Sequence, residues 1–135
     1  MTNLFIKNTE FTPLINFNTT ENKFIISGES RPENTKLFYT PVLDWVINYY
    51  NLLYFQHEGS KNKTLPIIIF EFQLDYFNST SAKFLFDILQ QLNKINKEIT
   101  PINIKWIFDK QDVDMKEAGQ EFCNLLNIPF LFEAI

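Results

Sequence analysis

Four consecutive polar residues, Asn78-Ser79-Thr80-Ser81, form the segment of the sequence best suited to chemistry. They follow an apolar stretch that ends at Phe77 and precede a stretch with helical apolar spacing, so their side-chain oxygens can accept hydrogen bonds from the first free amides of a helix. One cap needs only one such side chain, whereas three successive hydroxyls at a helix N-terminus also suit phosphorylation. The residues alone leave both interpretations open, a plain helix cap and a phosphoacceptor.

Two residue types that often serve in catalysis occur once each. His57 begins a polar segment that runs to Lys63 and predicts a surface loop, where no second group orients the imidazole as a catalytic base. Cys123 lies beside Phe122 in an apolar helical pattern, which indicates a packed, inert thiol. A single cysteine also excludes an internal disulfide framework and a Cys-based zinc site.

Acidic residues gather before and along the last predicted helix, at Asp109, Asp112, Asp114, Glu117 and Glu121. The central glycine and the oxygen spacing of a calcium loop are missing, and acids at a helix start interact favourably with the helix dipole. We therefore expect a helix start and a solvated face rather than a metal site. A small enzyme or ligand-binding domain that uses Glu33, Asp75 or Asp109 at the strand ends is the alternative to a binding protein.

The length of 135 residues fits one compact domain, residues 1–135. The chain has 45% apolar and 21% charged residues, which is typical of globular proteins. The net charge of −4 and the single arginine, Arg31, argue against a nucleic-acid partner. No apolar run is long enough to span a bilayer, and the first residues lack the features of a signal peptide. We therefore expect a cytoplasmic domain with neither a nucleic-acid nor a membrane partner.

The first half of the chain predicts a hairpin followed by a helix. Strand-like segments at 14–18 and 23–27 flank polar residues, and the segment 28–34 is rich in turn and cap residues, which predicts a loop. A helix from about Thr35 to Phe55, capped by Asn34, has an apolar stripe formed by Phe38, Val42, Trp45, Val46, Tyr49 and Leu53.

The second half alternates strands with helices, which predicts parallel pairing. A strand from Leu65 to Phe77 precedes the helix that begins at the hydroxyl cluster, whose inward face is expected to contain Ala82, Leu85, Phe86, Leu89 and Leu92. A strand at 102–108 and an edge strand at 129–132 flank a third helix, 112–126, with Met115, Ala118, Phe122 and Leu125 inward. The fold class is therefore α/β, a mixed β-sheet with three main helices packed on it.

Short segments of this sequence together resemble the SiaC family of bacterial regulatory phosphoproteins. They occur in order from about Thr12 onward and comprise residues 28–34, Asp44-Trp45, Tyr76 to Lys83, Trp106 to Asp109, and Asp112 through Phe122. Each segment is short, but the ordered set is specific to the family. This resemblance favours the phosphoacceptor over the plain cap.

The resemblance implies a single STAS-like domain, similar to the anti-sigma-factor antagonists, that acts as a non-enzymatic switch without a cofactor. In the family, a partner kinase phosphorylates the hydroxyl residue after the signature asparagine and a partner phosphatase reverses this. The unmodified form binds and activates a diguanylate cyclase, which links the switch to cyclic-di-GMP signalling and biofilm formation. By motif position the acceptor is Ser79, with Thr80 as the alternative.

The residues around the acceptor are the expected partner-binding surface. They are Asn78, Thr80, Ser81, Lys83, Phe84, Asp87, Arg31 and Glu33. Phe84 and Ile88 are spaced four apart beside the core stripe, a position that fits the core and a partner surface equally well.

Overall fold

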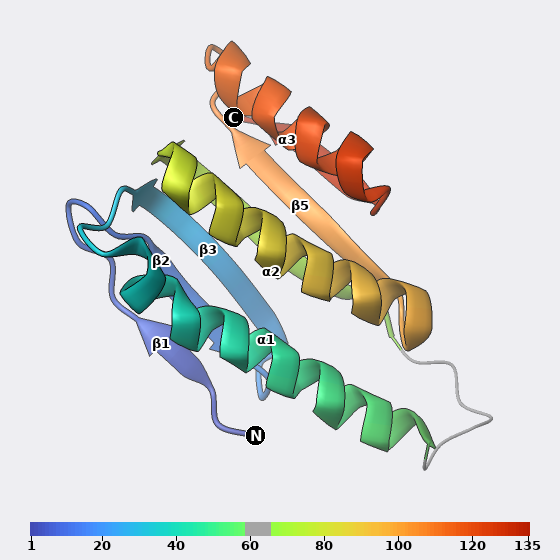
Figure 1. The fold of residues 1–135 in the computed structure, drawn as a ribbon. Coiled ribbons are helices and arrows are strands. Elements are labelled where there is room, and N and C mark those ends of the chain that lie inside the picture. Colours follow the sequence, from blue (N-terminus) through green and yellow to red (C-terminus); the bar gives the residue numbers. More distant parts are fainter. Residues whose placement is uncertain (59–65) are drawn as a thin grey trace.

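The computed structural model describes residues 1–58 and 66–135, and it shows three helices packed on one face of a six-stranded sheet (Figure 1). The predicted α/β class is thereby confirmed. In chain order the elements are β1 (Leu4–Ile6), β2 (Leu14–Asn18), β3 (Lys23–Ser30), α1 (Thr35–Glu58), β4 (Ile68–Phe77), α2 (Ser79–Glu98), β5 (Ile102–Phe108), α3 (Val113–Leu126) and β6 (Phe130–Ala134).

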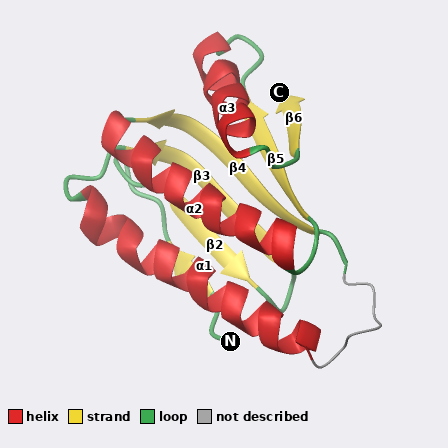
Figure 2. Ribbon diagram, turned by 45° about the vertical axis from the view of Figure 1, so that its right-hand side comes forward, coloured by secondary structure: helices red, strands yellow, loops and turns green. Residues whose placement is uncertain are grey.

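The sheet is mixed and its strand order follows the chain, from β1 to β6. β1, β2 and β3 pair antiparallel, which confirms the predicted hairpin, and β3, β4, β5 and β6 pair parallel. Three of these parallel strands are each followed by a helix, so α1, α2 and α3 all begin at the edge of the sheet where the parallel strands end (Figure 2). The short strand β1 was not expected from the sequence.

β3 is longer than its sequence pattern suggests. The prediction that a loop begins at Gly28 is wrong, because the strand continues to Ser30 after a register shift between Gly28 and Glu29. Gly28 has a φ of +104°, a conformation that side chains disfavour. The extension pairs Ser30 with Phe77 of β4 and therefore carries Ser30 to the start of α2.

Aromatic side chains of α1 and the sheet form one end of the core. Trp45 is 7% exposed, and the centroid of its ring lies 5.0 Å from that of Phe17 and 6.1 Å from that of Phe24. The predicted stripe of α1 is buried except for Phe38, which is half-buried, while the neighbouring Tyr39 is completely buried. α1 continues to Glu58, so the prediction that His57 lies in a loop is wrong. The rest of that predicted loop, residues 59–63, and the predicted strand start at Leu65 lie outside the described residues.

The inward face of α2 is slightly different from the predicted one. Leu85, Leu89 and Leu92 are completely buried as expected, but Phe86 and Ala82 are only half-buried. Ile88 is also completely buried, which assigns it to the core.

α3 is rotated relative to the prediction. Its buried residues are Met115, Gly119, Phe122 and Leu126, whereas Ala118 is half-buried and Leu125 is 65% exposed. The cause is Trp106 of β5, because a Cβ atom at Gly119 would lie 2.5 Å from the indole ring. Glycine thus takes the core position that a hydrophobic pattern assigns to a larger residue. Cys123 is half-buried on the same helix, with Sγ 3.5 Å from the Ile128 carbonyl oxygen.

The chain closes with β6, which confirms the predicted edge strand. Within residues 1–58 and 66–135, none of the helices is both long and apolar enough to cross a membrane.

Candidate phosphoacceptor site

The hydroxyl cluster forms the first turn of α2, at the carboxyl ends of β3 and β4. α1 and α2 run side by side and start at the same edge of the sheet (Figure 1). Asn78 is extended, and its backbone N–H donates to the Ser30 carbonyl oxygen over 3.1 Å. This bond fixes the start of α2 to the end of β3.

A chain of buried hydroxyl groups lies beneath this turn. Ser81 Oγ donates to the Ser30 carbonyl oxygen over 3.0 Å, and Ser30 Oγ donates to Ser81 Oγ over 2.9 Å. Because the Ser30 proton is used there, the Tyr39 hydroxyl is the donor in its own short contact with Ser30 Oγ. Burial raises the pKa of Tyr39 to about 12, although its hydrogen bonds with the two serines act in the opposite direction. The hydroxyl protons of Ser30, Tyr39 and Ser81 therefore all have an acceptor.

Ser81 is consequently a structural residue. Its side chain is completely buried, so the prediction that Ser81 contacts a partner is wrong for the folded domain. The roles of Ser30 and Tyr39 were not foreseen, because a serine at a strand end and a tyrosine in an apolar helix give no sequence signal of a contact between them.

Asn78 caps α2, as the sequence indicates. Its Oδ1 accepts from the Ser81 backbone N–H over 2.9 Å and from Thr80 Oγ1 over 3.1 Å. Thr80 is exposed, and its Oγ1 lies 3.0 Å from Thr35 Oγ1 in the first turn of α1. Because Thr80 donates to Asn78, Thr35 is the donor in this second bond. Thr80 thus joins the starts of two helices.

Ser79 differs from both of its neighbours. It is exposed, and among the described residues its side chain has no hydrogen-bond partner. Ser79 and Thr80 are the first two residues of α2, whose backbone N–H groups have no acceptor within the helix. The first turn of α2 therefore presents one free hydroxyl and two free amides to the surroundings.

Two cations of the predicted partner-binding surface, Arg31 and Lys83, contact other side chains. Arg31 Nε lies 2.9 Å from Glu29 Oε2, and its guanidinium carbon lies 4.6 Å from the centroid of the Phe11 ring. Lys83 Nζ lies 5.7 Å from the centroid of the Phe84 ring. Neither the first turn of α1 nor that of α2 contains an acid. The N-termini of α1 and α2 therefore both contribute a positive potential at the first turn of α2.

The other predicted partner-binding residues differ in how exposed they are. Lys83 and Glu33 are exposed, and Asp87 is half-buried. Phe84 is also half-buried, and its ring stacks on that of Tyr39 at a centroid distance of 5.7 Å. Phe84 therefore helps to join α2 to α1 and still presents part of its ring to solvent.

The carboxylates of the alternative enzyme hypothesis do not share one hollow. Asp75 lies with Asp112 and Asp114 in a shallow hollow of about 290 Å³, which Glu33 and Asp109 do not line. Asp112 Oδ1 accepts from the Met115 backbone N–H and so caps α3. Within residues 1–58 and 66–135, no three His, Cys, Asp or Glu side chains converge as metal ligands do.

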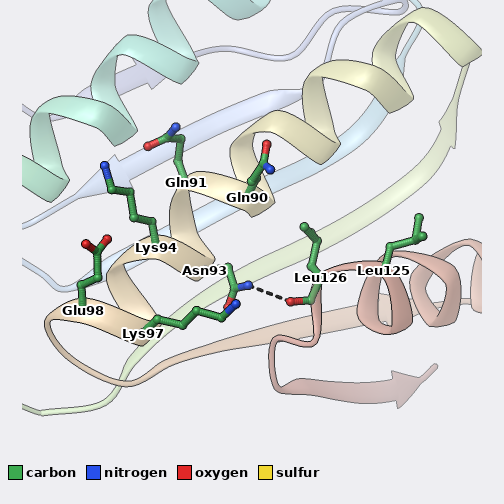
Figure 3. Close-up of a pocket in the computed structure, with 8 residues that line it drawn as sticks. All are labelled: Gln90, Gln91, Asn93, Lys94, Lys97, Glu98, Leu125 and Leu126. Atoms are coloured by element: carbon green, nitrogen blue, oxygen red, sulfur yellow. Dashed lines mark hydrogen bonds between the residues drawn. The ribbon is translucent and has the colours of Figure 1, made fainter.

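A second hollow lies between the ends of α2 and α3. Figure 3 shows Asn93 donating from Nδ2 to the Leu126 carbonyl oxygen over 2.7 Å, which satisfies the last turn of α3. Lys94, Lys97 and Glu98 at the C-terminal end of α2 also line it. A helix of 20 residues is about 30 Å long, so this hollow is remote from Ser79.

Comparison with known proteins gives a consistent result. The model of the SiaC family regulatory phosphoprotein matches residues 6–135. An uncharacterised protein of Pseudomonas aeruginosa strain UCBPP-PA14 is 28% identical over 134 residues, which cover 99% of this chain and 98% of that protein. The crystal structure of apo-SiaC from Pseudomonas aeruginosa is 26% identical, with a TM-score of 0.81 over 99% of this chain and 100% of that one.

A further similar structure is a complex. A chain in the crystal structure of the diguanylate cyclase SiaD with its activator SiaC, also from Pseudomonas aeruginosa, is 25% identical to this chain. The TM-score is 0.81, and the match covers 98% of this chain and 99% of that one.

Proposed function

This chain belongs to the SiaC family of regulatory phosphoproteins, and we propose that it binds and activates a diguanylate cyclase under the control of phosphorylation at Ser79. The observation that carries the choice of residue is the exposed Ser79 hydroxyl, which has no hydrogen-bond partner among the described residues. A partner kinase adds the phosphate and a partner phosphatase removes it. The cyclase makes the signalling molecule cyclic-di-GMP. The chain itself regulates the cyclase and catalyses no reaction.

Ser79 suits a kinase better than either neighbouring hydroxyl. Ser81 is buried and hydrogen-bonded to Ser30, so a kinase reaches it only if the first turn of α2 opens. Thr80 is accessible, but its hydroxyl must break its hydrogen bonds to Asn78 and Thr35 before it can enter the active site of a kinase. Ser79 gives up no side-chain hydrogen bond to any residue that the structure describes. The cost of presenting the hydroxyl therefore favours Ser79.

Phosphorylation at this position is compatible with the fold. The phosphate adds about −1.5 to −2 charges at neutral pH, and the N-terminus of a helix stabilises a negative charge by about 0.3–1 kcal/mol. The free N–H groups of Ser79 and Thr80 are natural donors for its oxygens. No acid occupies the first turn of α1 or α2 to repel it. We therefore expect the phosphorylated domain to remain folded.

The regulatory effect must then fall on the complex with the cyclase. An unpaired dianion buried in an interface costs several kcal/mol, and each 1.4 kcal/mol lowers affinity about tenfold. Arg31 is paired with Glu29, and the Lys83 ammonium group lies over the Phe84 ring. We therefore infer that the unmodified form binds the cyclase and that the phosphate releases it.

The surface around the first turn of α2 is the proposed contact area. It combines Lys83, Asp87 and the open part of Phe84 on α2 with Arg31 and Glu33 in the segment between β3 and α1. Leu37, on the first turns of α1, is 73% exposed and supplies an apolar contact beside these charges. A mixed polar and apolar patch of this kind is typical of reversible protein complexes.

The experiment is a cyclase assay with purified proteins. The unmodified chain should raise the rate of cyclic-di-GMP formation, and a form with phosphoserine at position 79 should not. Ser79→Ala should activate permanently, and Thr80→Ala is the matched control that should still be switched off by the kinase. Mass spectrometry after kinase treatment should find the phosphate on Ser79. Phosphate on Thr80 alone, or full activation by the phosphorylated form, contradicts the proposal.

A further inference from the structure

The two edges of the sheet are not protected to the same extent. An edge strand presents unpaired N–H and C=O groups, and proteins usually protect such edges by short strands, lysine, proline or bulges. β1 has only three residues, whereas β6 has five and pairs with β5 without a register shift. The sequence of β6, Phe130-Leu131-Phe132-Glu133-Ala134, contains neither lysine nor proline. The outer edge of β6 is therefore open to another strand.

Large apolar side chains accompany this open edge on both faces of the sheet. Leu131 is 50% exposed, and its register opposite Lys105 places it on the face that carries no helix. Phe132 is 40% exposed and lies opposite the buried Trp106, on the face that carries the helices. α3 lies over β5 and leaves β6 at the side of the helical layer (Figure 2). An added strand would thus cover apolar surface as well as backbone groups.

We propose that β6 pairs antiparallel with the β6 strand of a second copy of this chain, around a two-fold axis at Phe132. This register aligns all five residues of the strand with those of the second copy and so makes the largest number of backbone hydrogen bonds. Phe132 faces the partner's Phe132, and Leu131 faces the partner's Glu133. Aromatic pairs directly across two strands are stabilising.

The charges of the open sheet face support this self-pairing. Lys105 Nζ lies 3.1 Å from Glu133 Oε2 and 3.9 Å from Glu71 Oε1. In the proposed dimer the row across the sheet runs from Glu71 through Lys105 and Leu131 to the partner's Glu133. Leu131 then separates Lys105 from the partner's Glu133, and each Glu133 keeps its contact with Lys105 on its own β5. The joined sheet therefore brings no unpaired acid to the axis.

The test is the mass of the full chain in solution, measured by sedimentation over a range of concentrations, with two matched variants. The wild type should reach twice 16.1 kDa. Phe132→Lys places like charges face to face at the axis and should weaken the dimer at least tenfold. Leu131→Lys faces the partner's Glu133 and should leave the dimer intact. A wild-type chain that stays at 16.1 kDa at every concentration overturns the proposal. Equal weakening of the dimer by both variants also overturns it, because it indicates apolar association without the proposed register.

Cross-linking keeps the proposal testable if Phe132→Lys fails to fold. Directly opposed residues of antiparallel strands have Cα atoms about 4.5–5.5 Å apart, within the range of a disulfide, and diagonal neighbours are about 7–8 Å apart. In a Cys123→Ala background, Phe132→Cys should therefore form an intermolecular disulfide on oxidation, and Leu131→Cys should form far less. Equal cross-linking of both positions, or none at position 132, contradicts the two-fold axis.

Discussion

Ser30 Oγ donates a hydrogen bond to Ser81 Oγ over 2.9 Å, although the two residues are 51 positions apart in the sequence. This bond joins the end of β3 to the first turn of α2 and leaves Ser79, two residues earlier, exposed on the same turn. Successive hydroxyls of one motif therefore have different roles. Ser81 holds the turn in place, and Ser79 is exposed on it without a hydrogen-bond partner among the described residues.

The first prediction separates these two roles by stability. Ser81→Ala leaves buried polar groups of Ser30 with fewer partners and should lower the free energy of unfolding by about 1–3 kcal/mol. Ser79→Ala removes an exposed hydroxyl and should change it by no more than about 0.5 kcal/mol. Urea denaturation of both variants measures the difference. Equal stability of the two would show that the buried hydroxyl chain does not hold the turn.

The aromatic core gives a second prediction. Trp45→Ala should lower the free energy of unfolding by about 3–5 kcal/mol, because it leaves a cavity beside Phe17 and Phe24. Ile47→Ala on the exposed side of α1 is the control, and it should cost about 0.5 kcal/mol or less. An unchanged melting temperature for Trp45→Ala would contradict the orientation of α1.

A third prediction concerns the contact between α3 and β5. Gly119→Ala places a methyl group 2.5 Å from the Trp106 ring, which is 1% exposed and cannot move freely. Overpacking costs about 1–3 kcal/mol, and the better helix propensity of alanine offsets at most about 1 kcal/mol. The variant should therefore be less stable than the wild type in thermal denaturation. Trp106→Phe should reduce this loss in a double-mutant cycle, and strict additivity of the two changes would argue against the contact.

The buried tyrosines predict a loss of stability in alkali. Burial raises the pKa of Tyr39 and of Tyr49 to about 12, from 10.0 for an exposed tyrosine. Between these values the unfolded chain releases protons that the folded chain retains. The stabilisation is complete below about pH 10 and is lost as the pH rises through about 12. Urea denaturation at several pH values should show this fall, and the variant with Tyr39→Phe and Tyr49→Phe should show less of it. Tyr76→Phe, at an exposed position, should leave the fall unchanged.

The sequence predicted most elements of this fold because each has a strong periodic pattern. The hairpin, the central strand β4 and its parallel neighbour β5 are correct. The end of β3 was missed because a glycine and polar residues there mimic a loop, and the phase of α3 was missed because Gly119 replaces a large core residue beside Trp106. These errors have one cause, since tertiary contacts overrode the local pattern.

The candidate site was predicted only in part, for a related reason. The motif at Asn78 to Ser81 is local, so the cap and the expected acceptor could be named from the sequence. The contacts from Ser30, Tyr39 and Thr35 join distant segments and have no local signature. Only the packed structure distinguishes the buried hydroxyl of Ser81 from the exposed one of Ser79.

The central claim is that phosphate on Ser79 controls the binding of a diguanylate cyclase. Titration calorimetry with the purified cyclase tests it most directly, using the unmodified chain and the chain that carries phosphoserine at position 79. We expect the phosphorylated form to bind at least tenfold more weakly, a difference of about 1.4 kcal/mol or more, while its melting temperature stays at or above that of the unmodified form. Equal affinity of the two folded forms for the cyclase would contradict the account.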